Sequence, residues 1–100
     1  MTLLRINKNG LRALPEEIAQ LTTLKIFDFS SNAVTRIPPS FSALVNLQEL
    51  AFVQNEVASL PLELATLGRL QRLYMAANRF TSLSDHLTTF TDLRYVAAAL

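Results

Sequence analysis

The side chains of this 100-residue sequence that could do chemistry are few and poorly arranged for catalysis. His86 is the only histidine and there is no cysteine, so neither an imidazole cluster nor a thiolate set is available to bind a metal ion. No serine or carboxylate is placed to make His86 a general base, and we expect a solvated or capping role for it. Glu16 and Glu17 are adjacent, so their side chains diverge and do not form a catalytic pair.

Phosphate binding and nucleophilic catalysis find no better support. Gly10 and Gly68 are the only glycines, which is too few for a loop that cradles phosphates. Ser30 and Ser31 lie just before a recurring asparagine and are interpreted as part of a turn. We therefore predict that the chain is not an enzyme and has no catalytic residue, no cofactor and no metal site.

The polar residues with the clearest spacing are asparagines that recur every 23 residues: Asn9, Asn32, Asn55 and Asn78. Apolar residues follow the same interval. Seven positions of the unit are apolar in all four full units, whereas a half-apolar chain would give about 1.4 such positions by chance. The pattern predicts one repeat domain over 1–100, with units at 1–23, 24–46, 47–69 and 70–92 and a partial unit at 93–100.

The elements that position these residues follow from the pattern within each unit. The fourth and sixth positions are apolar and alternate with polar or variable residues, which predicts a short strand. Stacked units would pair these strands into a parallel sheet, and the rest of each unit would supply the crossover. Pro15, Pro38 and Pro61 suit the first position of a short helix, with Ser84 or Asp85 as a cap in the last unit. The fold class is an α/β solenoid with a short parallel β-sheet on its concave face and turns and short 3-10 or helical segments on its convex face.

A buried turn after each strand explains the asparagines. Such a turn leaves backbone N–H and C=O groups that are costly to bury without partners. An asparagine amide offers two donors and one acceptor, so stacked asparagines can bond the backbone of their own turn and of the next one. We therefore predict a structural ladder for this column and no binding role.

The line Leu24-x-x-Phe27-x-Phe29-x-x-Asn32-x-Val34 resembles the L-x-x-L-x-L-x-x-N-x-L pattern of the leucine-rich repeat family. The resemblance covers the whole chain. Its 23-residue unit and its Leu14-Pro15, Ile37-Pro38 and Leu60-Pro61 steps are most similar to intracellular, Ras-group-related repeat proteins, and Ser84 departs from the proline pattern. The resemblance implies a protein-interaction module, and it makes a small GTPase or a phosphatase subunit conceivable as the partner.

The third, fifth and seventh positions of each unit are expected to point away from the core. They are free for recognition, and tyrosine and arginine among them are frequent binding hot spots. The predicted partner-binding residues are Arg5, Ile26, Asp28, Glu49, Ala51, Val53, Arg72, Tyr74 and Tyr95. Two alternatives stay open: Glu49 and Arg72 form only a surface pair worth about 0–1 kcal/mol, or the convex turns and repeat ends bind instead.

Composition restricts the partners and the compartment. The net charge of +1 comes from charges of both signs scattered along the chain, which argues against a nucleic-acid surface. No apolar stretch is long enough to span a membrane, and no signal peptide is visible. The chain has neither cysteine nor an Asn-x-Ser/Thr glycosylation site, which favours a cytoplasmic location.

Both ends of the repeat array lack polar caps. We therefore expect a fragment of a longer protein, with flanking repeats or another chain covering the ends; Ala97–Ala99 is unusual for the family. Two further functional hypotheses follow. The chain is a structural segment of a large complex, or it is a regulatory repeat region of an enzyme whose catalytic domain lies elsewhere.

Overall fold

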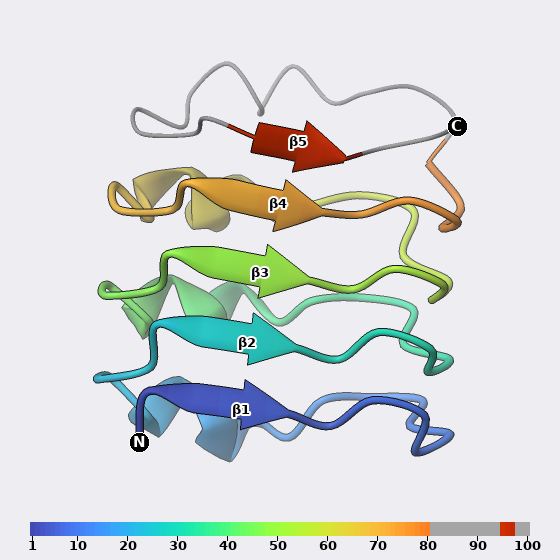
Figure 1. Ribbon diagram of the computed structural model, residues 1–100, viewed down its shortest axis with the longest axis horizontal. Coiled ribbons are helices and arrows are strands. Elements are labelled where there is room, and N and C mark those ends of the chain that lie inside the picture. The colour runs from blue at the N-terminus through green and yellow to red at the C-terminus, as the bar shows by residue number, and fades with distance from the viewer. Residues whose placement is uncertain (81–94, 98–100) are drawn as a thin grey trace.

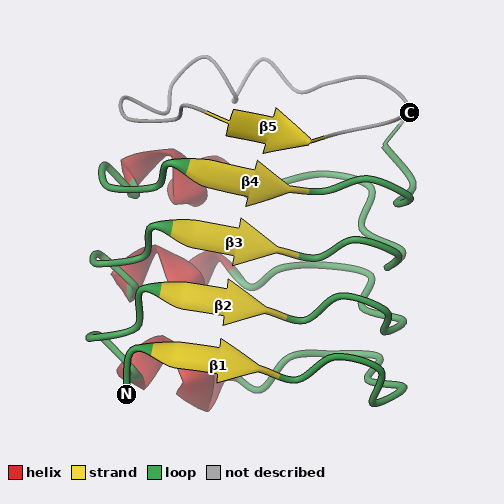
Figure 2. Ribbon diagram, in the orientation of Figure 1, coloured by secondary structure: helices red, strands yellow, loops and turns green. Residues whose placement is uncertain are grey.

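The structure is a computed structural model that describes residues 1–80 and 95–97. Its strands form a five-stranded parallel sheet in chain order. The strands are β1 Leu3–Arg5, β2 Ile26–Asp28, β3 Glu49–Ala51, β4 Arg72–Tyr74 and β5 Tyr95–Ala97. Among the described residues, three 3-10 helices lie behind the sheet: η1 Glu16–Gln20, η2 Pro39–Ala43 and η3 Leu62–Thr66 (Figures 1 and 2).

The strand register reproduces the sequence period. Leu3 pairs with Ile26, Ile26 with Glu49, and Glu49 with Arg72, each a step of 23 residues. Each helix connects one strand to the next on the same side of the sheet, so the predicted solenoid is confirmed. The Ser84 and Asp85 cap and His86 lie outside the described residues.

The core lies between the sheet and the helices. Phe27 and Phe29 from β2 and the turn after it are fully buried, as is Phe52 from the next unit. The rings of Phe29 and Phe52 stack with centroids 5.4 Å apart and an interplanar angle of 9°, and Phe52 contacts Phe80 at 6.5 Å. Aromatic contacts of this kind add to the hydrophobic burial and join three successive units.

In the first three units the proline lies just before the helix, one residue earlier than the predicted first helical position. Pro15, Pro38 and Pro61 have ψ angles of 136–138°, which is extended backbone, and the helix starts after them. Their carbonyl groups accept the N–H groups of Ile18, Phe41 and Leu64 at 3.1–3.2 Å. The prolines therefore cap the helices, and only η2 has a proline, Pro39, as its first residue.

One feature of the turn carried no sequence signal. The eighth residue of each unit has a left-handed backbone, with φ angles of 57–59°, and it is a different amino acid each time: Lys8, Ser31, Gln54 and Ala77. This conformation is unfavourable for residues with a Cβ atom. It immediately precedes the asparagine and turns the chain out of the strand.

Candidate interaction surface

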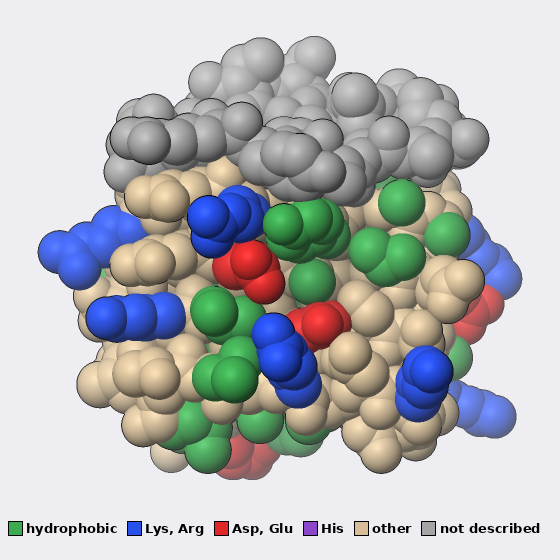
Figure 3. Space-filling view, in the orientation of Figure 1, with side chains coloured by type: hydrophobic (Ala, Val, Ile, Leu, Met, Phe, Trp, Pro, Cys, Tyr) green, Lys and Arg blue, Asp and Glu red, His purple; other side chains and the backbone are tan. Residues whose placement is uncertain are grey.

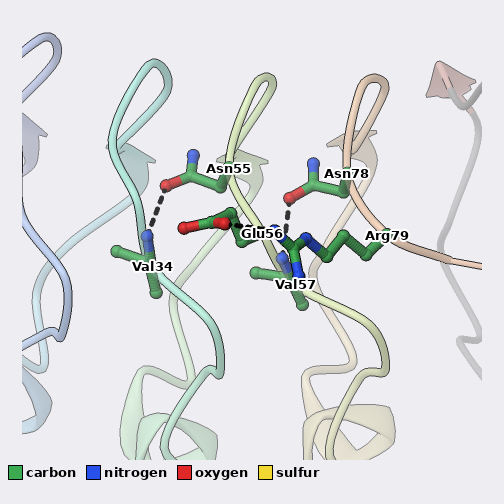
Figure 4. Close-up of polar contacts among 6 residues, drawn as sticks. All are labelled: Val34, Asn55, Glu56, Val57, Asn78 and Arg79. Carbon is green, nitrogen blue, oxygen red and sulfur yellow. Dashed lines mark hydrogen bonds and ion pairs between the residues drawn. The ribbon is translucent and has the colours of Figure 1, made fainter.

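Three of the four asparagines, Asn32, Asn55 and Asn78, bond the backbone along the solenoid, whereas the side chain of Asn9 makes no hydrogen bond within residues 1–80 and 95–97. Asn55 Nδ2 donates to the carbonyls of Phe52 in its own unit and Phe29 in the preceding unit, at 3.1 and 3.0 Å. Its Oδ1 accepts the N–H of Val34 at 3.1 Å, and Asn78 accepts the N–H of Val57 in the same way (Figure 4). The amides therefore bond the backbone of the preceding unit. The sequence had led us to expect bonds to the following unit.

These contacts use the asparagines for folding. Asn32 and Asn78 each donate to three backbone carbonyls, and Asn32 also accepts the N–H groups of Asn9 and Leu11. Asn55 is only 6 % exposed. Asn55, which is buried and bonded to two units, therefore has no surface left for a partner.

The outer side of the sheet, opposite the helices, is the predicted contact surface, and we call it the strand face. It comprises the third, fifth and seventh positions of the first four units: Leu3, Arg5, Asn7, Ile26, Asp28, Ser30, Glu49, Ala51, Val53, Arg72, Tyr74 and Ala76. Basic, acidic and hydrophobic side chains are intermixed over the strands on this side of the molecule (Figure 3). The surface is therefore neither a purely apolar nor a purely basic patch.

Glu49 and Arg72 face each other on neighbouring strands. Their closest N and O atoms are 3.9 Å apart, and the two side chains are 20 % and 54 % exposed. A long contact between exposed charges is worth about 0–1 kcal/mol, because water screens it and the side chains lose freedom. The pair orients Arg72 without removing it from solvent.

Asp28, a predicted contact residue, makes hydrogen bonds within the chain that the sequence did not indicate. Its Oδ1 accepts the N–H of Ser30 at 3.0 Å, and its Oδ2 accepts the amide of Asn7 at 3.2 Å. The hydroxyl of Ser30 in turn accepts the N–H of Val53 at 3.0 Å. These bonds hold the chain at the end of β2 and link it to the neighbouring units, so Asp28 has a structural role in addition to any contact with a partner.

Ala51 departs from the expectation of an exposed contact residue, because it is only 7 % exposed. In the register it lies between Asp28 and Tyr74, and both neighbours have larger side chains. They flank Ala51 in the sheet, and at 7 % exposure it offers little area to a partner.

The remaining predicted residues stay accessible. Arg5 is exposed, and Ile26, Val53 and Tyr74 are half-buried on the strand face. Tyr95 is the first residue of β5, and its side chain is outside the described part of the structure. The accessible apolar residues come from three neighbouring units, which the 23-residue register brings side by side.

A shallow hollow on the helix side was not predicted. It has a volume of about 240 Å³ and is lined by Arg36, Ile37, Pro39, Ser59, Pro61 and Glu63. Ligand pockets have volumes of roughly 300–1,000 Å³, so this hollow is small for a ligand site. Its residues come from the thirteenth to seventeenth positions of two successive units, a juxtaposition that the repeat register could have indicated.

The described residues contain neither a metal-binding cluster nor a membrane-spanning helix. Residues 1–80 and 95–97 contain no cluster of three or more His, Cys, Asp or Glu side chains that could hold a metal ion. Within the same ranges, no helix is long and apolar enough to cross a bilayer.

No protein-family model and no curated protein sequence matches the chain. Solved structures do match. An internalin from Listeria monocytogenes superposes with a TM-score of 0.87 at 23 % identity over 99 % of this chain. A leucine-rich repeat protein of Leptospira interrogans gives 0.68 at 26 % identity over 97 %, and the leucine-rich repeat domain of APL1B gives 0.87 at 20 % identity over 97 %.

These neighbours are all leucine-rich repeat proteins, and this chain has the leucine-rich repeat fold, as its sequence resemblance implied. The chain spans 28–31 % of the length of each solved chain. The likeness therefore concerns less than a third of each solved chain.

Proposed function

We propose that the chain is a protein-interaction module whose strand face binds a protein partner. The observation that carries the proposal is that different positions of each unit serve the core, the turn and the exposed surface. The fourth and sixth positions fill the core and the asparagines bond the turns, whereas Arg5, Ile26, Arg72 and Tyr74 on the strand face remain accessible. The fold of the structural neighbours, a solenoid of leucine-rich repeats, supports the same role.

The mechanism is preorganisation. Strands in a sheet lie about 4.8 Å apart, so the four described units present columns of side chains across about 14 Å of a rigid surface. A rigid surface loses little conformational freedom on binding, and more of the contact energy then appears as affinity. The width suits one contact patch, and a standard interface of roughly 800 Å² per partner would extend beyond it.

The finer features of the role are proposals too. A scaffold or signalling role and a small GTPase or phosphatase subunit as partner rest on the resemblance to Ras-group-related repeats, and a cytoplasmic location rests on the lack of cysteine and of a glycosylation site. The other two hypotheses, a structural segment of a complex and a regulatory region of an enzyme, differ in what flanks the chain. The full-length sequence distinguishes them from a free-standing module.

The test compares variants on the two sides of the solenoid. A partner recovered with the wild-type chain is purified, and its affinity is measured for Tyr74→Ala, Arg72→Glu and the helix-side control Arg36→Glu. We expect each strand-face variant to weaken binding by about tenfold or more, as hot-spot changes do, with an unchanged thermal transition. Unchanged affinity in both strand-face variants would refute the assignment.

A further inference from the structure

On the strand face, the carboxylates have bonding partners within the chain, whereas the cations have fewer. Its two carboxylates already have partners: Asp28 accepts two hydrogen bonds, and Glu49 is paired with Arg72. The cations are less occupied. Arg5 is exposed and makes no hydrogen bond or ion pair with any described residue, and Lys25, just before β2, is exposed as well.

Arg5 shows the imbalance most clearly. It lies directly beside Asp28 in the strand register, yet no ion pair joins them among the described residues. The Asp28 carboxylate is turned to Asn7 and to the backbone of Ser30. A guanidinium offers several donors in a planar fork that matches a carboxylate. Arg5 can therefore donate hydrogen bonds to a carboxylate of another molecule.

The helices behind the sheet carry exposed carboxylates. Glu16 and Glu17 in η1 and Glu63 in η3 are all exposed. The three described helices contain no lysine or arginine, whereas the strand face has arginines beside its carboxylates. An acidic segment therefore finds arginine partners on the strand face and no cation on these helices.

We propose that the strand face binds an extended acidic peptide segment of its protein partner. In this arrangement Arg5 and Arg72 each pair with a carboxylate, and Ile26, Val53 and Tyr74 contact apolar side chains between them. The inference rests on the proposed function and names the chemistry of the partner.

The spacing of the two arginines specifies the peptide further. They lie three strands apart, on the order of 15 Å, and an extended peptide covers that distance in about four residues. Side chains four residues apart point to the same side of an extended chain. The preferred segment therefore carries two carboxylates four residues apart, with an apolar residue between them.

A peptide fits this surface better than a nucleic acid does. The strand face keeps Asp28 and Glu49 among its cations and exposes apolar surface at Ile26 and Val53. The apolar residues between the two arginines suit peptide side chains, whereas nucleic-acid surfaces gather basic residues in one stripe.

The experiment selects ligands from a random displayed peptide library on the immobilised chain and then measures affinities of the enriched peptides. We expect acidic peptides with two carboxylates four residues apart. Arg5→Gln and Arg72→Gln should each weaken them by about tenfold, a typical loss for a solvated charge pair with partial desolvation. Glu49→Gln should strengthen them, because it releases Arg72, and Arg36→Gln on the helix side should change nothing.

The outcomes separate this inference from the proposed function. Neutral or basic peptides that still lose affinity in Tyr74→Ala would overturn the acidic preference and leave the strand face as the binding surface. Enriched peptides that bind every strand-face variant with wild-type affinity would overturn both this inference and the proposed function. A single-stranded RNA that displaces the acidic peptide at equal phosphate concentration, or a library that yields no acidic peptide, would also overturn the inference.

Discussion

The guanidinium of Arg72 lies 3.9 Å from the carboxylate of Glu49, a residue 23 positions earlier on the adjacent strand. The contact exists because the repeat period places equivalent positions of successive units side by side. It shows how the solenoid turns sequence spacing into a surface. It also leaves Arg72 more than half exposed and available to a partner.

The Glu49–Arg72 pair should contribute little to stability. A double-mutant cycle with Glu49→Gln and Arg72→Gln is expected to give a coupling energy below about 1 kcal/mol in the free energy of unfolding, as for other exposed pairs. Urea unfolding of the four proteins measures it. A coupling above about 2 kcal/mol would mean that the pair is structural and would weaken the case for Arg72 as a binding residue.

Asn55→Ala should destabilise the chain strongly. The change removes a side chain that bonds the carbonyls of Phe29 and Phe52 and the N–H of Val34. Each buried group left without a partner costs about 1–3 kcal/mol, so the free energy of unfolding should fall by roughly 2–4 kcal/mol.

The matched control for this change is Asn9→Ala. Asn9 is exposed, and its side chain makes no hydrogen bond within residues 1–80 and 95–97. Its loss should cost less than about 0.5 kcal/mol, the usual range for surface substitutions. Equal urea midpoints for the two variants would show that the ladder does not stabilise the fold.

Ala77→Asn should stabilise the turn after β4. Ala77 has a left-handed backbone with φ of 57°, and asparagine adopts this conformation more readily than alanine. A gain of about 0.5 kcal/mol is expected in thermal unfolding. Ala58→Asn serves as the control, because Ala58 is exposed and has no positive φ. An equal gain at both sites would attribute the effect to surface polarity.

Phe52→Ala should remove the centre of the aromatic column that joins three units. Phe52 is fully buried and contacts Phe29 and Phe80, so its loss should cost about 3–5 kcal/mol. Val45→Ala removes an apolar side chain that is 54 % exposed and should cost less than about 0.5 kcal/mol. Calorimetric transitions of the two variants provide the comparison, and a similar loss in both would contradict this description of the core.

The fold was predictable because the period is visible in the types of residue. Asparagine at the ninth position and apolar residues at the fourth and sixth recur in all four full units, and their chemistry leaves few alternatives to a stacked parallel sheet. The left-handed eighth residue was not predictable, since Lys8, Ser31, Gln54 and Ala77 share no property. At this position the turn determines the backbone conformation, and the type of side chain does not indicate it.

The candidate surface was predictable only in outline. Strand alternation identifies which side chains point outward, but exposure also depends on the neighbours in the sheet. Ala51 is covered because Asp28 and Tyr74 flank it, and Asp28 is engaged because Asn7 and Ser30 lie within reach of its carboxylate. Such contacts require the three-dimensional register and the side-chain conformations, which periodicity alone does not supply.

The most direct test of the strand face is a map of the contact surface by NMR. Backbone amide shifts of the isotope-labelled chain are recorded while a selected peptide ligand or the purified partner is added. The proposal predicts that the largest shifts fall in residues 3–7, 26–30, 49–53 and 72–76 and that η1, η2 and η3 stay unperturbed. Shifts concentrated in the helices, with the strand residues unchanged, would contradict it.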